Sequence, residues 1–378
     1  MFKTRTGTVR IAATAVAVMI VASGCSAGYG TSPAGPQTSL PMGQTLGTDL
    51  SPDVSVLKQL DKQVVIGTTV DPANGAQNPY GLTVAPLTIG KLTKGDLVVC
   101  NFNASSNVQG TGESIVALHP VPNADPIHVS SIEALIGCDA LALDIDGTIW
   151  AAAMVANDNP VIASTGKLLS NIKGKPFDQP WGQVLARHKS RSAFYETNAG
   201  TGSVVRINLG AKFTYDVIAT GFPVNHGKPG TVLAPSGLAY DASVDTLYFA
   251  DGKNNTIVAF KNVSKIPKGG IKAIDNGMKF SGPSAGDARI VFSGKPLNGP
   301  ISTALLPNGN LVVGNTLDPT GKNLILEISS AGKLLDVRNV DKGAAGSIFG
   351  MIATGTSISD AKVYFNDDNN NNVQVLEH

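Results

Sequence analysis

The sequence contains few charged residues, few aromatic residues and few long apolar stretches at helical spacing. Charged residues make up 15% of its 378 residues and aromatic residues 6%, while glycine numbers 42. The 29 lysine and arginine residues nearly cancel the 28 aspartate and glutamate residues, which gives a formal net charge of +1. Domains that bind nucleic acid carry an excess of basic residues, so nucleic acid is not expected as a partner. The scarcity of helical spacing favours an all-β class.

Several short catalytic motifs are also missing. The sequence has no His-Glu-x-x-His zinc motif, no Cys-x-x-Cys-His haem motif and no phosphate-binding loop. These absences exclude the enzyme classes that depend on those motifs. A reaction, or a binding role, must therefore be inferred from the fold and from scattered side chains.

Residues 1–24 have the pattern of an export signal. Lys3, Arg5 and Arg10 form a positive region, residues 11–22 are apolar, and Ala-Ser-Gly-Cys ends at Cys25. The apolar stretch is too short to span a bilayer, which needs about 20 helical residues. The pattern resembles a bacterial lipoprotein signal, which predicts lipidation at Cys25, with simple secretion as the alternative. We therefore expect an exported protein, anchored in a membrane and facing the periplasm or the cell surface.

Residues 25–62 are rich in glycine, proline, serine and threonine. This composition predicts a flexible tether between the anchor and a folded domain. The remaining residues, 63–378, are enough for one large all-β domain, which we expect to be a monomer.

A pattern of three short strands recurs along this domain. It is clearest at residues 234–260, where alternating or apolar runs are each closed by Asp, Asn or Gly, as in antiparallel strands joined by tight turns. Six copies align on the residues near the start of each inner strand, which are Gly81, Ala140, Gly182, Gly237, Ser302 and Gly350. Such a unit cannot bury its own faces, so the repeats predict a six-bladed β-propeller.

The last repeat lacks its outermost strand, because the chain stops at His378 soon after the third strand of that unit. Residues 63–70 form a strand-like run before the first unit. We expect this N-terminal strand to complete the sixth blade and close the ring.

Residues 141–150 and 237–260 resemble NHL repeats. The whole domain is more loosely similar to the six-bladed propellers of the gluconolactonase and streptogramin-lyase groups. The resemblance covers about residues 63–378 and implies the fold strongly but the reaction weakly.

Polar residues follow the second strand in most repeats, on the face where propeller loops surround the channel mouth. Their oxygens suit a hard cation such as Ca²⁺ or Mg²⁺, although Asp and Asn also close tight turns through their own side chains. The candidate metal or ligand residues are Asn103, Asn198, Asp251, Asn315 and Asp367. No cofactor is certain from this pattern.

The two related enzyme groups imply further candidates. The lactonases use a glutamate from the first blade, but the first unit here opens with Asn78-Pro79-Tyr80-Gly81 and has no Glu at that point. The lyases use a histidine as general base, and His226 is the histidine expected to reach the channel face.

Aromatic and cysteine residues provide the remaining candidates. Tyr80, Trp181 and Phe349 occupy the same place in three repeats, either as stacking surfaces for a sugar or peptide or as core between blades. Cys100 and Cys138 are an even pair in an oxidising compartment, so they form either a disulfide or two buried thiols.

Two hypotheses on function follow. The first is a membrane-tethered propeller, without enzymatic activity, that binds an envelope protein, peptide or glycan. The second is a lactonase- or lyase-like enzyme that depends on a divalent cation and has its site at the channel mouth. A metal-dependent enzyme must lose activity on chelation, whereas a binding module need not.

Overall fold

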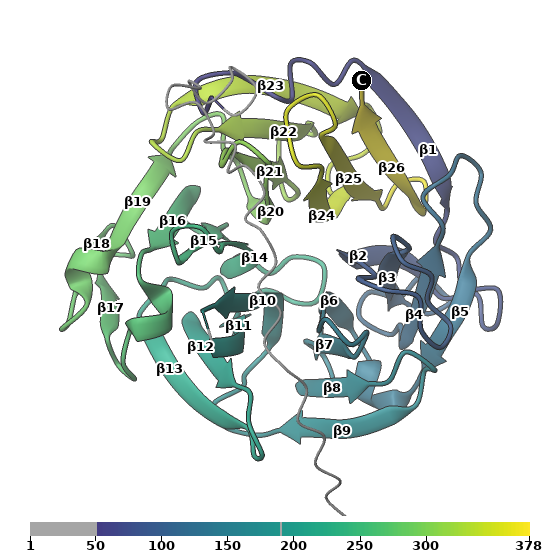
Figure 1. Cartoon of the computed structure of the whole chain (residues 1–378), viewed down its shortest axis with the longest axis horizontal. Coiled ribbons are helices and arrows are strands. Elements are labelled where there is room, and N and C mark those ends of the chain that lie inside the picture. The colour runs from purple at the N-terminus through teal and green to yellow at the C-terminus, as the bar shows by residue number, and fades with distance from the viewer. Residues whose placement is uncertain (1–50, 190) are drawn as a thin grey trace, which may run out of the picture. The chain divides into compact units, whose positions relative to one another are not determined.

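The computed structural model describes residues 51–189 and 191–378, which form six sheets arranged as blades around a central channel (Figure 1). The expected all-β class and the six-bladed propeller are therefore confirmed. The expected signal peptide, Cys25 and most of the tether lie outside the described residues. No helix in the described part of the chain is long and apolar enough to cross a membrane.

The first three blades follow the chain in order. Blade 1 holds β2 (Gln77–Val84), β3 (Leu97–Asn103), β4 (Ser114–Leu118) and β5 (Ile127–Ser131). Blade 2 holds β6 (Cys138–Leu143), β7 (Ile149–Ala153), β8 (Asp158–Ile162) and β9 (Leu168–Lys173). Blade 3 holds β10 (Pro180–His188), β11 (Arg191–Asn198), β12 (Ser203–Asn208) and β13 (Thr214–Thr220).

The other three blades complete the ring. Blade 4 holds β14 (Pro235–Asp241), β15 (Thr246–Asp251), β16 (Thr256–Phe260) and β19 (Ala288–Ser293). Blade 5 holds β20 (Pro300–Leu305), β21 (Leu311–Asn315), β22 (Asn323–Ile328) and β23 (Leu334–Asp341). Blade 6 holds β24 (Ile348–Thr354), β25 (Lys362–Asp367), β26 (Asn372–Glu377) and β1 (Lys62–Thr68).

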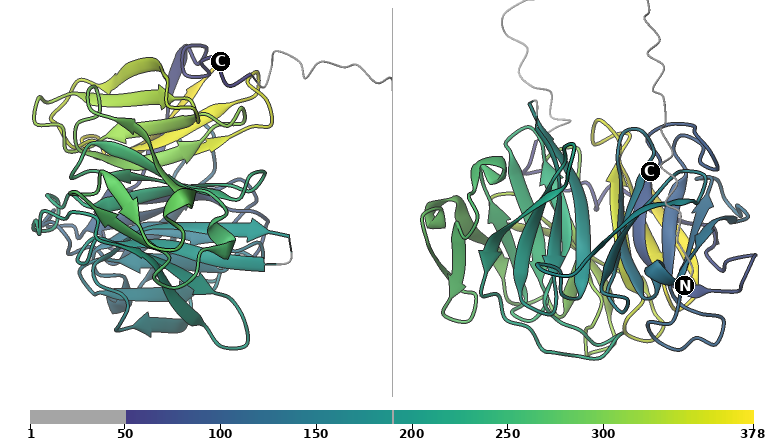
Figure 2. Two further views of the ribbon diagram at one scale, coloured as in Figure 1. Left: turned by 90° about the vertical axis from the view of Figure 1, so that its left-hand side faces the viewer. Right: turned by 90° about the horizontal axis from the view of Figure 1, so that it is seen from below.

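Each blade places its first strand at the channel, and the strands of each sheet run between the two faces of the ring (Figure 2). We call the face where the inner strands begin the upper face, and the face where they end the lower face. All six residues on which the repeats align lie in the six inner strands.

Close packing of neighbouring inner strands explains why glycine recurs there. A Cβ atom on Gly182 would lie 2.5 Å from the carbonyl oxygen of Ser236 in the next blade. A Cβ atom on Gly350 would lie 2.3 Å from the carbonyl oxygen of Tyr80. Because these separations are far below contact distance, a larger residue would push adjacent blades apart.

The N-terminal strand β1 is the outer strand of the sixth sheet. It pairs antiparallel with β26, with Gln63 opposite Leu376 and Thr68 opposite Asn372. Blade 6 is thus assembled from both ends of the described chain. Strand β1 supplies the outermost strand of this sheet and pairs with β26, whose edge would otherwise have no partner.

The residues before β1 are also folded against the propeller. Val56, Leu57 and Leu60 have no exposed surface and pack in one hydrophobic cluster with residues of blades 5 and 6. The Glu327 carboxylate accepts hydrogen bonds from the backbone N–H groups of Val56 and Leu57, at 3.1 and 2.7 Å. Ordered packing therefore starts inside the segment expected to be a tether (residues 25–62), because apolar side chains at its end find a buried site.

An insertion between β16 and β19 extends blade 3. It contains the short strands β17 (Ile271–Ile274) and β18 (Lys279–Ser281), with the 3-10 turns η3 (Val263–Lys265) and η4 (Ala285–Asp287) on either side. Strand β17 pairs parallel with β13, which makes the third sheet six-stranded. The insertion lies at the outer rim of the ring (Figure 1).

Candidate functional site

The central channel contains two cavities lined by the inner strands of all six blades. The upper cavity has a volume of about 70 Å³ and lies where the inner strands begin, at Tyr80, Asp139, Trp181 and Phe349. The lower cavity has a volume of about 350 Å³ and lies where the inner strands end. The two cavities share wall residues such as Leu82 and Leu238, so they are consecutive parts of one channel.

The three candidate stacking residues close the upper end of the channel. Tyr80, Trp181 and Phe349 are only 3%, 5% and 9% exposed. The Tyr80 ring stacks on Phe349 with centroids 3.6 Å apart and on Phe102 with centroids 4.0 Å apart. Tyr80 and Phe349 stack on each other, and Trp181 is buried in the same hydrophobic cluster, which is the packing alternative. A stacking role toward a sugar or peptide stays a prediction.

Residues 224–234, which we call the cover segment, pack over these rings. Val232 and Ala234 belong to the same buried cluster as the aromatic residues, and Val224 and Leu233 pack against it. The Asn225 side chain holds the segment together by accepting from the N–H groups of Gly227 and Leu233. The cover segment thus joins the aromatic residues at the upper mouth.

The cover segment reaches across to blade 1. A Cβ atom on Gly230 would lie 2.8 Å from Oε1 of Gln109, and one on Gly110 would lie 3.0 Å from Cβ of Pro229. His226 lies on this segment, with an exposed side chain and a positive φ of 51°. Its expected role as a general base at the channel stays a prediction.

Asp139 is a buried carboxyl in the channel wall. It directly precedes Ala140, which is the position that Tyr80, Trp181 and Phe349 hold before the glycines of their own blades. The residue is 4% exposed. Neither of its carboxyl oxygens has a hydrogen-bond partner among the described residues. Burial raises the pKa of Asp139 well above its usual value.

Glu196 on β11 is a second buried carboxyl, placed between blades 2 and 3. Its side chain is fully buried, and Gln183 Nε2 donates to its Oε2 at 2.8 Å. Burial raises the pKa of Glu196 to about 8, although the hydrogen bonds from Gln183 and Asn159 oppose the shift. Near neutral pH this carboxyl therefore carries a proton most of the time.

Four of the five candidate metal or ligand residues occupy one equivalent position in their blades, and Asn103 lies two residues beyond that position, which Asn101 holds in blade 1. Each is the last residue of a second strand and is fully buried: Asn103, Asn198, Asp251, Asn315 and Asp367. Since the inner strands stand between these positions and the channel, none of the five residues lines either channel cavity. They are spread around the ring rather than gathered at its centre.

These side chains hold the turns of the upper face. Asn198 Oδ1 accepts from the N–H of Asp178 while its Nδ2 donates to the carbonyl of Pro176. Asn315 makes the same pair of bonds to the N–H of Asn298 and the carbonyl of Pro296. The repetition of this arrangement in blades 3 and 5 supports the turn-forming interpretation.

Two aspartates of the upper face have carboxyls with strongly raised pKa values. Burial raises the pKa of Asp251 to about 7, and one of its oxygens has no partner among the described residues. The pKa of Asp368 also rises to about 7, first through burial and then through the nearby charge of Asp367. Within residues 51–189 and 191–378, no three His, Cys, Asp or Glu side chains are grouped so that they could hold a metal ion.

Cys100 and Cys138 are free, buried thiols in the same hydrophobic cluster. They lie on β3 and β6 of adjacent blades. Burial, followed by a hydrogen bond with Cys100, raises the pKa of the Cys138 thiol well above its usual value. The two residues are thus neighbours, as expected, and a disulfide between them stays a prediction.

The lower cavity is the larger and more apolar part of the channel. Its wall includes a leucine, isoleucine, valine or methionine from every blade, namely Leu82, Leu143, Val184, Leu238, Leu305 and Ile352. Pockets that bind ligands have volumes of about 300–1,000 Å³ and predominantly apolar walls. The lower cavity lies within this volume range, and most of its wall residues are apolar, while polar and apolar atoms share its exposed wall surface about equally.

Sequence reasoning missed several of these features. Asp139 could have been found by comparing repeats, because it stands where three other blades have an aromatic residue. Glu196 could have been found as an acidic residue that directly follows the apolar and aromatic run Ala193-Phe194-Tyr195 in β11. A Gly-Pro-Ser-Ala-Gly sequence at residues 282–286 has the residue types of a nucleophile elbow. Its Ser284, however, precedes η4, a three-residue turn, rather than a strand-to-helix elbow.

Comparisons with known proteins support the fold. No protein-family model matches the chain, and no curated protein matches it in sequence. Among solved structures, a gluconolactonase from Xanthomonas campestris superposes with a TM-score of 0.54 at 14% identity, covering 80% of this chain and 86% of that one. A catalytically inactive virginiamycin B lyase from Staphylococcus aureus with quinupristin superposes with a TM-score of 0.50 at 16% identity, covering 83% and 85%.

A third structure extends the range of roles found on this fold. A nidogen/laminin complex matches with a TM-score of 0.52 at 16% identity, covering 75% of this chain and 87% of that one. The structural neighbours therefore include lyase and lactonase propellers and a protein complex. The resemblance to the lactonase and lyase propellers is confirmed for the fold, and at these identities it extends no further.

Proposed function

We propose that this protein is a membrane-anchored binding module of the cell envelope, which holds a peptide or protein segment in the lower cavity. The observation that carries the proposal is the apolar wall of this cavity, contributed by the inner strands of all six blades. Cys25 supplies the lipid anchor, and the protein faces the periplasm or the cell surface. Mass spectrometry of the mature N-terminus tests the anchor.

The chemistry of the wall favours a peptide over a glycan. Leucine, isoleucine and valine side chains gain little from sugar hydroxyls, whereas they gain about 25 cal/mol for each Å² of apolar ligand surface removed from water. A cavity of about 350 Å³ is large enough for one or two bulky apolar side chains of a peptide. The closed aromatic cluster at the upper mouth supports the choice of the lower face.

Filling the lower cavity is expected to abolish binding. Ala353 is a half-buried wall residue near the end of β24, and Ala353→Trp would place an indole in the space that the ligand needs. We expect heptapeptides selected from a random library on the purified full-length protein to be rich in apolar residues. Their affinity for the Ala353→Trp variant, measured by calorimetry, should fall at least tenfold.

The matched control is Ala211→Trp, which adds the same side chain in the exposed turn between β12 and β13. Peptide affinity for this variant should equal that of the unmodified protein. Equal affinities for all three proteins would place the peptide site elsewhere and would contradict the proposal.

One observation favours the second candidate, a lactonase- or lyase-like enzyme that uses a divalent cation at the upper channel. Four residues that line the upper cavity have oxygens without a hydrogen-bond partner among the described residues: Asp139, Gln183, Ser302 and Thr303. Such oxygens suit a hard cation or ordered water. Native mass spectrometry of the unmodified protein, before and after chelation, and of the Asp139→Asn variant tests this candidate. A bound ion that chelation removes and that Asp139→Asn lacks supports it. An unmodified protein that carries no ion contradicts it.

A further inference from the structure

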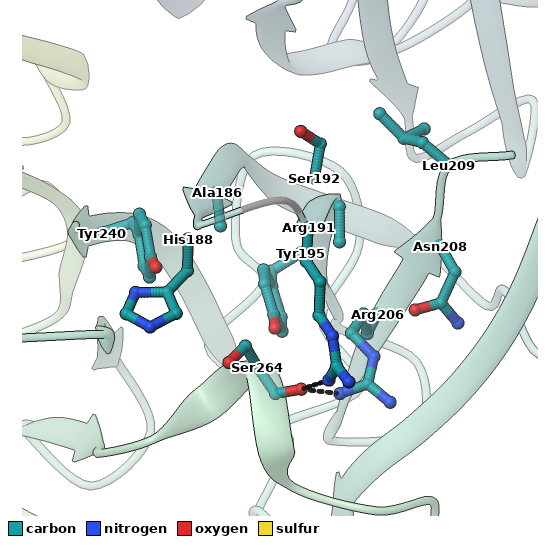
Figure 3. Close-up of a pocket in the computed structure, with 11 residues that line it drawn as sticks. Ala186, His188, Arg191, Ser192, Tyr195, Arg206, Asn208, Leu209, Tyr240 and Ser264 are labelled. Atoms are coloured by element: carbon teal, nitrogen blue, oxygen red, sulfur yellow. Dashed lines mark hydrogen bonds between the residues drawn. The ribbon is translucent and has the colours of Figure 1, made fainter.

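A third cavity opens on the lower face beside the channel. It has a volume of about 290 Å³ and lies between the lower end of blade 3 and the η3 turn of the insertion (Figure 3). Its wall is formed by residues from β10, β11, β12 and β14 together with Ser264 of η3. We call it the arginine pocket, after Arg191 and Arg206 in its wall.

Two guanidinium groups meet at one end of the arginine pocket. Arg191 Nη1 and Arg206 Nη1 both donate to the carbonyl oxygen of Ser264, each at 3.3 Å (Figure 3). Arg206 also donates to the carbonyl of Ile266 at 3.0 Å. Two like charges thus share one neutral acceptor, an arrangement that costs energy unless negative charge lies nearby.

One of the two guanidinium groups has a carboxylate ion-pair partner, and a second carboxylate, Asp245, lies behind the wall, where it accepts from Ser264 Oγ at 2.7 Å and from the Tyr240 hydroxyl at 3.0 Å. Arg206 forms an ion pair with Asp216 at 2.7 Å, and its side chain is 14% exposed. Arg191 has no ion pair among the described residues, and no Asp or Glu belongs to the wall of the pocket. Arg191, an exposed residue, therefore keeps guanidinium donors that no carboxylate of the described residues occupies.

The rest of the wall adds neutral donors. Burial raises the pKa of Tyr195 to about 12, although Arg206 opposes the shift, so its hydroxyl keeps its proton. His188 and Tyr240 lie at the opposite end of the pocket from the guanidinium groups (Figure 3). Arginine is the residue that best recognises carboxylates and phosphates, through paired N–H donors in a fixed plane.

The arginine pocket adjoins the lower cavity. Tyr240, near the end of β14, belongs to the walls of both. Leu185 lines the lower cavity, and the next residue, Ala186, lines the arginine pocket. One ligand can therefore place an apolar part in the channel and a charged part in the arginine pocket.

We propose that the arginine pocket binds the oxyanion of a ligand whose apolar part occupies the lower cavity. The anion is a carboxylate, such as a peptide C-terminus or acidic side chain, or a phosphate monoester. It sits beside Arg191 and Tyr195 and accepts from the guanidinium donors of Arg191 that no carboxylate occupies. This inference rests on the proposed function for its apolar part, and on the arginine pocket for its charge.

Three probes with the same alkyl chain separate the two parts of the proposal. Decanol, decanoate and decyl phosphate are titrated below their micelle concentrations into the purified full-length protein. We expect decanoate or decyl phosphate to bind about tenfold more tightly than decanol, the gain of a charge-assisted contact. The larger gain identifies the class of anion.

The variant Arg191→Gln removes the guanidinium group that has no ion-pair partner among the described residues and keeps a polar side chain. It should bind decanol as the unmodified protein does and should lose the tenfold gain for the anions. The control Arg187→Gln lies on the same hairpin, but its guanidinium pairs with Asp144 outside the pocket, at 2.6 Å. It should keep the gain.

The outcomes distinguish failure of this inference from failure of the proposed function. If decanol and both anions bind equally well, the arginine pocket takes no anion while the apolar site stands. If none of the three binds, the apolar lower site fails as well. If Arg191→Gln also weakens decanol binding, Arg191 acts on the structure of the site, and the anion proposal is overturned.

Discussion

Glu196→Gln is expected to stabilise the protein at pH 8 and to change its stability little at pH 4. The Glu196 carboxyl is fully buried, and its pKa is raised to about 8 from an ordinary value of 4.5. Folding therefore requires this group to keep a proton that the unfolded chain has already released. Glutamine has nearly the same shape, is always neutral and retains a donor for the surrounding amides.

The sign of the pH dependence follows from proton linkage. Between about pH 4.5 and 8 the folded protein binds more protons at Glu196 than the unfolded chain does, so the free energy of unfolding falls as the pH rises. A shift of this size corresponds to about 4 kcal/mol at pH 8. Asp139, Asp251 and Asp368 have raised pKa values and act in the same direction.

Urea unfolding at a series of pH values measures this effect. The unmodified protein should lose stability between pH 5 and pH 8, and Glu196→Gln should flatten that loss. Glu133→Gln, a change at an exposed carboxyl on η2 (Glu133–Leu135), is the control and should follow the unmodified protein. A stability that rises between pH 5 and pH 8 would falsify this interpretation of Glu196.

Removal of all residues before Thr69 is expected to prevent stable folding. The deletion removes β1 from the sixth sheet and exposes the edge of β26. It also removes the buried side chains of Val56, Leu57 and Leu60, each worth about 1.5–3 kcal/mol of burial. Their loss is comparable with the whole stability of a typical domain, about 5–15 kcal/mol.

The deletion is measured by circular dichroism and thermal unfolding, with a chain that begins at Ser51 as control. The control keeps every contact that β1 and the segment before it make with other described residues, and should unfold as the full chain does. Glu327→Ala is a milder test, because it leaves the N–H groups of Val56 and Leu57 and the Ser55 hydroxyl without their acceptor. It should cost about 3 kcal/mol or more. Unchanged unfolding midpoints in both variants would show that the N-terminal segment is dispensable.

The fold was accessible from the sequence because its signals are local. Alternating apolar residues and turn residues recur in each repeat, and Gly81, Gly182, Gly237 and Gly350 mark inner strands where neighbouring backbones touch. The six units, the inner strands and the position of the N-terminal strand followed from those signals. The ordered packing of Val56, Leu57 and Leu60 did not, because a glycine- and proline-rich composition hides a short apolar run.

The candidate sites were less accessible because they depend on contacts between distant segments. The arginine pocket joins Arg191, Arg206 and Ser264, and its charge balance depends on the partner Asp216. No spacing in the sequence indicates that these residues meet. The polar residues at the ends of second strands were easy to see, but the inner strands keep them away from the channel.

The packing of the cover segment was also hard to predict from the sequence. Its glycine and proline residues read as an open loop that would bring His226 to the channel. The valine, leucine and alanine residues at its two ends pack on the aromatic cluster of the upper mouth, and the role of His226 stays a prediction. Those apolar residues were the signal in the sequence that the segment is packed, because large apolar side chains are more often buried than exposed.

Photo-crosslinking tests the central claim most directly. A heptapeptide selected on the full-length protein is resynthesised with a photoreactive leucine, irradiated in the complex and mapped by mass spectrometry. The account predicts crosslinks to the lower ends of the inner strands, at residues such as Leu143, Leu305 and Ile352, and their loss in Ala353→Trp. Crosslinks confined to the cover segment and the upper face would contradict it.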